Sequence, residues 1–187
     1  MVGALDRQWA TLQAVEAASA SLPLAQAFVQ SLQLYRALMP TVHAQALQHV
    51  PLLTMLFAND CAYLAHAAQT YAVRAAEMPS VYLSQKQTLE SALCTEAGLV
   101  RDAGQQWQVV QLALQADALN ESLDGADGFV RTDDDARHEA CVRAVEQVCH
   151  ILAHLANVWS EVLSRAARSA ALSQLIDGVF DLSLIHI

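Results

Sequence analysis

The fold is decided by residues 141–163, which read CVRAVEQVCHILAHLANVWSEVL. Apolar side chains recur there at alternating spacings of four and three, as the a and d positions of a heptad do. These positions are Cys141, Val145, Val148, Leu152, Leu155, Trp159 and Val162. The spacing predicts a helix that packs along a neighbouring helix for most of its length.

Residues on either side of this helix complete the C-terminal half. The stretch 124–135 contains Gly125, Gly128 and a run of acids, so it is the clearest loop in the sequence. The acids at its end also suit the positive N-terminus of the helix that follows. A last helix is expected over about 166–180.

A long helix is predicted over 84–123, before the acidic loop. Its apolar positions are spaced by three and four, and they are Val109, Leu112, Ala116, Leu119 and Leu123. Gly98 and Gly104 predict an interruption in the first half of this helix, because glycine favours non-helical backbone.

Prolines divide the N-terminal half into further helical segments. We expect a first helix over 4–20 and a second that restarts at Pro23, because proline suits a first turn. Met39-Pro40 should end that second helix, since the residue before a proline avoids the helical region. Thr41 should then cap a short segment that reaches residue 48.

The next helix is expected over 51–77, where Val50-Pro51 opens it and Met78-Pro79 breaks the pattern after it. Its apolar face consists of Leu53, Phe57, Cys61, Leu64, Ala68 and Tyr71. A more polar face consists of Asn59, Tyr63, His66 and Thr70. Polar groups on a bundle helix often bond to a neighbouring helix, so we favour a structural role for this face over a direct functional one.

The composition agrees with an all-α fold. The chain holds six Gly and four Pro in 187 residues, and its abundant Ala, Leu and Gln lose little rotamer freedom in a helix. Together with the proline-marked joints and the lack of strand alternation, this predicts an elongated helical bundle or rod. We expect one helical-rod region over residues 1–181.

The last six residues, 182–187, read LSLIHI and look like the translation of a sequencing adapter. Such a scar should be excluded from reasoning about the fold. We therefore expect the native reading frame to continue past Asp181 and the chain to be a fragment of a larger protein.

Charge and apolar content exclude several classes of ligand. The net charge of -9 repels nucleic-acid phosphate and anionic lipid. Between Ala17 and Val73 only Arg36 and Asp60 are charged, and so much uncharged surface suggests contacts with protein on more than one side. The most apolar stretch, 50–58, is shorter than the roughly 20 residues that span a bilayer.

Cellular location is indicated by the N-terminus and the cysteines. The first residues carry Asp6 and Arg7 and no compact apolar run, so no signal peptide is expected. The four cysteines form no CxxC pair and fall in helical patterns, which favours a reducing compartment. We expect a cytosolic or peripheral protein.

A metal site is the sharpest enzymatic alternative. His150 and His154 lie one helical turn apart with Cys149 beside them, and two ligands four residues apart face the same way. There is no HExxH motif and no third ligand, so we favour a structural role for them, as for His43 and His49. No GxSxG motif, P-loop or dinucleotide fingerprint is present, and we expect no catalytic residue, no cofactor and no metal.

Two patches of the sequence resemble the zeste-white ten family. The first reads MPTVH at 39–43, VP at 50–51 and NDCAYLAH at 59–66; the second follows the acidic loop and reads AVEQV at 144–148 and VWSEVL at 158–163. The resemblance is poor over 78–107, and Val42 stands where the family usually has an aromatic residue. The residues that carry it are Pro40, Thr41, His43, Pro51, Asn59, Cys61, Tyr63, His66 and Trp159, and we expect structural roles for them.

The resemblance implies a non-enzymatic scaffold of the multisubunit tethering type. Its implied function is vesicle tethering in Golgi-to-endoplasmic-reticulum transport, with a RINT-type and a NAG-type partner. A second implied role is at kinetochores with Rod and Zwilch, in the spindle checkpoint. The implied location is cytoplasmic, at the endoplasmic reticulum through partners, and at kinetochores in mitosis. The alternatives are another helical-rod tether subunit, of exocyst or Golgi type, and a helical metal-binding protein that uses His150 and His154.

Overall fold

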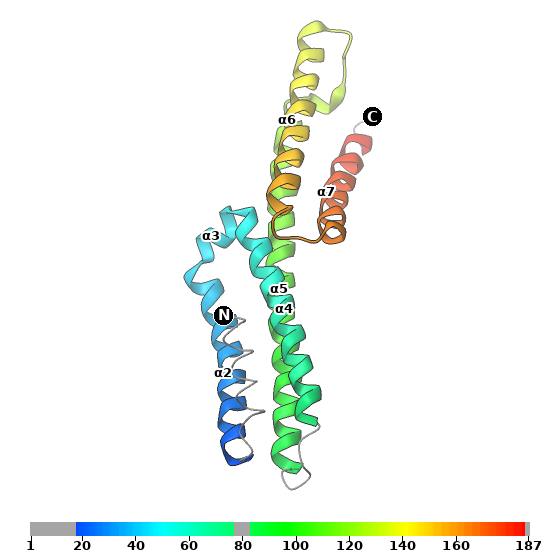
Figure 1. Cartoon of the computed structure of the whole chain (residues 1–187). Coiled ribbons are helices and arrows are strands. Elements are labelled where there is room, and N and C mark those ends of the chain that lie inside the picture. The colour runs from blue at the N-terminus through cyan, green and yellow to red at the C-terminus, as the bar shows by residue number, and fades with distance from the viewer. Residues whose placement is uncertain (1–17, 77–82, 186–187) are drawn as a thin grey trace. The chain divides into compact units, whose positions relative to one another are not determined.

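A computed structural model describes residues 18–76 and 83–185, and every regular element in this part of the chain is helical (Figure 1). The elements are α2 (Ala18–Val42), α3 (Ala44–His49), α4 (Pro51–Ala76), α5 (Leu83–Asp124), the 3-10 helix η2 (Asp127–Phe129), α6 (Asp135–Trp159) and α7 (Arg165–Ile185). The predicted all-α class is confirmed. The expected break at 78–79 and most of the expected helix over 4–20 lie outside the described residues.

The chain divides into two compact units. Unit 1 comprises residues 1–45 and 57–106, and unit 2 comprises residues 46–56 and 107–187. Helices α4 and α5 therefore contribute residues to both units. In the part of the chain that the structure describes, no helix combines the length and apolar character that a membrane crossing needs.

Unit 1 is built from α2, most of α4 and the first part of α5. The rings of Phe28 and Tyr71 meet edge to face with centroids 5.1 Å apart, and Tyr35 stacks on Phe57 at 5.9 Å. These two pairs show that α2 runs antiparallel to α4. The buried apolar residues of unit 1 come from α2, α4 and α5 and include Leu32, Cys61, Leu64, Ala68, Leu93, Ala97 and Val100.

A buried polar contact joins α2 to α5 within unit 1. Glu96 is almost fully buried, and its carboxylate lies 3.5 Å from Arg36 Nε and accepts a 3.1 Å hydrogen bond from Gln33 Nε2. A buried carboxylate is costly unless such partners are present. The contact therefore favours one alignment of α2 on α5.

Gly104 does not interrupt α5, which is continuous over 42 residues, so the predicted interruption is wrong. A Cβ added at Gly104 would lie 2.6 Å from Cys61 Cβ and 3.2 Å from both Cα and the carbonyl oxygen of Ala58. Gly104 therefore allows α5 to pack closely against α4. The packing offsets the helix-propensity cost of glycine, which is about 1 kcal/mol.

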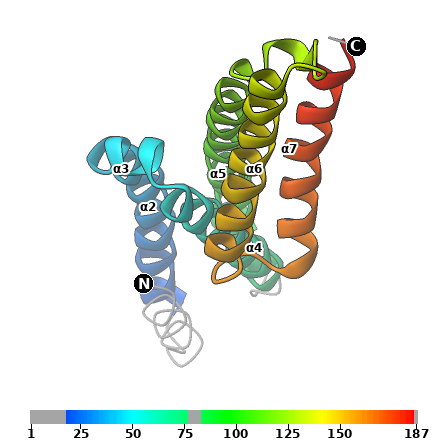
Figure 2. The same ribbon diagram turned by 90° about the horizontal axis from the view of Figure 1, so that it is seen from above.

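Unit 2 places the C-terminal part of α5 beside α6 and α7 (Figure 2). Its core consists of Met55, Leu112, Leu119, Val148, Leu155, Trp159, Ala171 and Leu175. Thr54 is also buried, where its hydroxyl hydrogen-bonds the Leu47 carbonyl and, at 3.2 Å, Gln111 Oε1. The start of α4 is therefore held in unit 2 by both apolar and polar contacts.

Three apolar positions of the predicted helix faces are exposed, which corrects those predictions. Val145 is exposed and Ala144 is buried in its place; likewise Leu53 is exposed beside buried Thr54, and Val109 is also exposed. A straight helix drifts about 20° per heptad from a 3.5-residue repeat, so a strict pattern leaves the buried face. Val162 follows the end of α6 but still packs against the core.

The joint between α2 and α3 also differs from the prediction. Helix α2 contains Pro23 and continues through Pro40 to Val42. The Thr41 hydroxyl donates to the carbonyl of Ala37 at 2.8 Å, so it bonds back into α2 and does not cap the next segment. The His43 amide donates to the carbonyl of Met39 at 3.0 Å and extends the turn past the proline.

The acids at the end of the acidic loop lie at the N-terminus of α6, as predicted, and one of them caps that helix. Asp134 Oδ1 accepts hydrogen bonds from the amides of Ala136 at 2.9 Å and Arg137 at 3.3 Å.

We expect Asp134→Ala to lower the free energy of unfolding by about 1 kcal/mol, measured by urea denaturation. Asp133→Ala is the matched control and should change it by less than about 0.5 kcal/mol; equal losses would contradict the assigned cap.

Candidate interaction surface

The structure separates the family-like residues into buried and exposed groups. Cys61 and Trp159 are fully buried, and Pro40 and Pro51 are half-buried. The exposed residues are Thr41, His43, Asn59, Tyr63 and His66. Cys61 and Trp159 serve packing and Pro51 starts a helix, whereas the exposed group is accessible to another protein.

Cys61 illustrates the buried group. Its side chain lies beneath α5 at Gly104, and burial raises the pKa of its thiol to about 12, with the charge of Asp60 adding to the shift. A thiol with that pKa stays protonated at neutral pH, and the thiolate is the nucleophile. Cys61 is therefore a packing residue.

The four cysteines should differ sharply in reactivity toward a thiol reagent. Cys94 and Cys149 are exposed, whereas Cys61 and Cys141 are buried. We expect the exposed pair to be labelled within minutes in native protein and the buried pair only after denaturant is added, because labelling needs access as well as ionisation. Mass spectrometry of labelled peptides reads this out; rapid native labelling of Cys61 would contradict its burial.

The exposed family-like residues of α4 lie on one stripe in unit 1, together with half-buried Thr70 and exposed Val73. Asn59, Tyr63, His66, Thr70 and Val73 follow one another at spacings of four and three, which places them along one side of a helix. We call this stripe the α4 surface. Tyr63 is 47% exposed and Val73 is 65% exposed. The Thr70 hydroxyl donates to the His66 carbonyl at 3.0 Å, within the same helix.

The α4 surface carries no formal charge along its length. Between Cys61 and Val73 the sequence has no acidic residue, lysine or arginine. Asp60 precedes that stretch, and partial burial raises the pKa of its carboxyl. Arg74 follows it and lies over the ring of Tyr71, with 5.9 Å to the centroid. A charge-free stripe with two large exposed side chains is typical of the centre of a protein interface, where charged residues are depleted.

A second apolar stripe, on α2, was not predicted from the sequence. Leu34, Leu38 and Val42 lie four residues apart and are 58%, 46% and 67% exposed. We call them the α2 surface. The sequence signal was their spacing, but choosing them over Phe28 and Leu32 required knowing which side of α2 the other helices cover.

The residues of the predicted metal alternative lie on the surface of α6. His150, His154 and Cys149 are exposed, and so are His43 and His49. Within residues 18–76 and 83–185, no group of three or more His, Cys, Asp and Glu side chains is placed to hold a metal ion. The arrangement supplies no constellation for metal chemistry there.

Comparison with known proteins decides the family. The family model described as "Centromere/kinetochore protein zw10, C-terminal" matches residues 6–121, which is more than half of the chain. The chain belongs to the zw10 family. The resemblance drawn from the sequence motifs is confirmed, and both the α2 and the α4 surface lie within the matched zw10 region.

Two mammalian relatives give the extent of the likeness. The rat "Centromere/kinetochore protein zw10 homolog" is 30% identical over 149 residues, which cover 78% of this chain and 18% of the rat protein. The mouse homolog is 31% identical over 133 residues, which cover 70% of this chain and 16% of the mouse protein. The chain thus spans less than a fifth of the length of these zw10 relatives. No solved structure matches the chain.

Proposed function

We propose that this chain is part of a non-catalytic scaffold subunit that works by binding other protein subunits along its helices. Membership of the zw10 family supports this, because the two relatives are named as centromere and kinetochore proteins. The observation that carries the proposal is the α4 surface, an exposed and uncharged stripe built largely from the family-like residues Asn59, Tyr63 and His66.

The α4 surface is suited to a protein partner on energetic grounds. Burying a large apolar side chain contributes about 1.5–3 kcal/mol, and Tyr63 and Val73 are both available. Tyrosine is also enriched among the residues that dominate binding energy. The Asn59 and His66 side chains can hydrogen-bond a partner and so select it.

We infer two assemblies in which such a scaffold would act. The first is a Golgi-to-endoplasmic-reticulum tether with a RINT-type and a NAG-type subunit, and the second is a kinetochore complex with Rod and Zwilch. The motif resemblance supports the first, and the names of the two mammalian relatives support the second. In both, the protein is cytoplasmic and reaches a membrane or kinetochore through its partners.

The proposal is tested by a matched pair of surface variants in the full-length protein. His66→Ala/Val73→Asp changes the α4 surface, and His150→Ala/Val145→Asp makes the same replacements at exposed sites on α6. After affinity purification from cells, we expect the first variant to recover about tenfold less of the partner subunits, a loss of roughly 1.4 kcal/mol. The second should recover normal amounts.

Two results would overturn the proposal. One is recovery of the wild-type protein as a lone monomer, without any further subunit. The other is equal recovery of partners by both variants. Circular dichroism of each variant confirms that the helices are intact, which separates a lost contact from a lost fold.

A further inference from the structure

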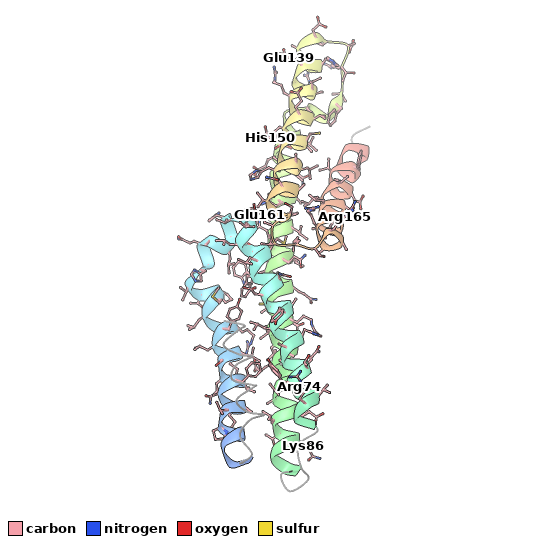
Figure 3. All side chains as sticks on the ribbon, in the orientation of Figure 1. Arg74, Lys86, Glu139, His150, Glu161 and Arg165 are labelled. Atoms are coloured by element: carbon pink, nitrogen blue, oxygen red, sulfur yellow. The ribbon has the colours of Figure 1, made fainter. Side chains whose placement is uncertain are left out.

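A shallow pocket lies between the end of α6 and the start of α7 in unit 2. Its volume is about 600 Å³, and two of its lining residues are Arg165 and Arg168. Figure 3 shows Arg165 at the start of α7 and Glu161 in the connection that follows α6. The two arginines lie three residues apart and so share one side of the helix.

These arginines are cationic side chains without a charge partner. Neither forms an ion pair with any residue that the structure describes. The first turn of α7 contains no acidic residue, and cations are disfavoured at the positive N-terminus of a helix. Two guanidinium groups at this position therefore lack a compensating charge among the side chains of unit 2 that the structure describes.

The surroundings of the arginines are locally basic in an acidic chain. The whole chain has a net charge of -9, yet between Gln147 and Ile176 the only acidic residue is Glu161. The two nearby arginines contribute most of the electrostatic energy of an anionic group inside the pocket. Coulomb energy falls with distance, and salt screens charges beyond about 8 Å.

The other lining residues fit a carboxylate on a short apolar stem. Asn157, Ser160 and Ser169 line the pocket and carry hydrogen-bonding side chains, while Ala156 and Leu172 add apolar lining. The Ser160 hydroxyl donates its only proton to the Asn157 carbonyl at 2.6 Å, so the donors left for a carboxylate are the Asn157 amide, the Ser169 hydroxyl and the two arginines. Arginine pairs with carboxylate through two parallel hydrogen bonds.

We propose that this pocket binds an acidic side chain of a partner protein, with Arg165 and Arg168 pairing its carboxylate. A protein segment fits better than an anionic membrane, because a membrane surface meets the whole negative charge of the chain, whereas one side chain meets only the pocket. The proposal makes no use of the α4 surface, so the two can fail independently.

The test uses the full chain and NMR of the arginine Nε–H groups, of which the sequence has nine. The probe is a capped peptide of alternating glutamate and alanine pairs, and the same peptide with glutamine is its control. We expect saturable shifts at Arg165 and Arg168 with the glutamate peptide only. Arg165→Gln/Arg168→Gln should weaken binding by about tenfold.

Further variants and probes decide the outcome. Arg131→Gln/Arg143→Gln removes the same charge from unit 2 outside the pocket and should change affinity less than about twofold. Arg165→Lys/Arg168→Lys keeps the charge but loses the paired hydrogen-bond geometry. Its affinity for the glutamate peptide should lie between those of the wild-type protein and the Arg165→Gln/Arg168→Gln variant. Equal binding by the pocket variant, no saturable shift, or binding of only inorganic phosphate or phosphatidylserine vesicles through these arginines would overturn the proposal.

Discussion

Trp159→Ala is expected to lower the free energy of unfolding of unit 2 by about 3–5 kcal/mol, the usual cost of truncating a buried aromatic residue. Trp159 is fully buried in a core that includes Met55, Leu155 and Leu175. Removing the indole leaves a cavity in a core to which α4, α5, α6 and α7 all contribute. Urea denaturation followed by circular dichroism measures the loss.

Two further variants define what Trp159 contributes. Val145→Ala, at a residue that is 45% exposed on the same helix, should change stability by less than about 0.5 kcal/mol. Trp159→Phe should cost less than Trp159→Ala, because Trp159 Nε1 has no hydrogen-bond partner to lose among the described residues. A Trp159→Ala variant as stable as the Val145→Ala variant would contradict the burial of Trp159 in the core of unit 2.

Gly104→Ala and Gly98→Ala should change stability in opposite directions. At Gly98 an added Cβ meets nothing within 4 Å, so alanine should stabilise α5 by about 0.5–1 kcal/mol through helix propensity. At Gly104 the new Cβ would clash with Cys61 Cβ and crowd the backbone of Ala58. We expect a net loss of about 1–3 kcal/mol from overpacking.

Thermal and urea unfolding of both glycine variants give the signs directly. The contacts at Gly104 are a Cβ atom and backbone atoms, which cannot rotate away as the end of a flexible side chain could. Relief requires α4 and α5 to move apart along their packed length. A stabilised Gly104→Ala variant would show that the two helices are not in close contact there.

Helix positions were predictable where the sequence marks both ends. The helix predicted over 51–77 is α4 (Pro51–Ala76), and the helix predicted over 84–123 is α5 (Leu83–Asp124). Proline at the first turn and the glycine-containing acidic loop are local signals, so no knowledge of the tertiary structure was needed. The N-cap at Asp134 follows from the same local chemistry.

Contacts between helices were less predictable, because one sequence signal has two structural meanings. A glycine inside a helical pattern can break the helix or allow another helix to pack closely against it. Only the position of Cys61 shows that Gly104 allows close packing. The exposure of Val109 and Val145 depends on which side of each helix faces its neighbours, and a strict heptad pattern drifts away from that side.

The candidate surface was only partly predictable for a related reason. Helical spacing alone separated exposed Tyr63 from buried Cys61 on α4. Spacing could not identify the α2 surface, since Leu34 and Leu32 are chemically alike. Their difference lies in which side of α2 the other helices of unit 1 cover.

The most direct test of a scaffold that binds through the α4 surface is site-specific cross-linking in cells. A photoreactive phenylalanine analogue replaces Tyr63 in the full-length protein, and the same analogue replaces exposed Val145 as the control. We expect a covalent adduct with another protein subunit from position 63 and none from position 145. An assembled complex that gives no adduct from position 63, or equal adducts from both positions, would contradict it.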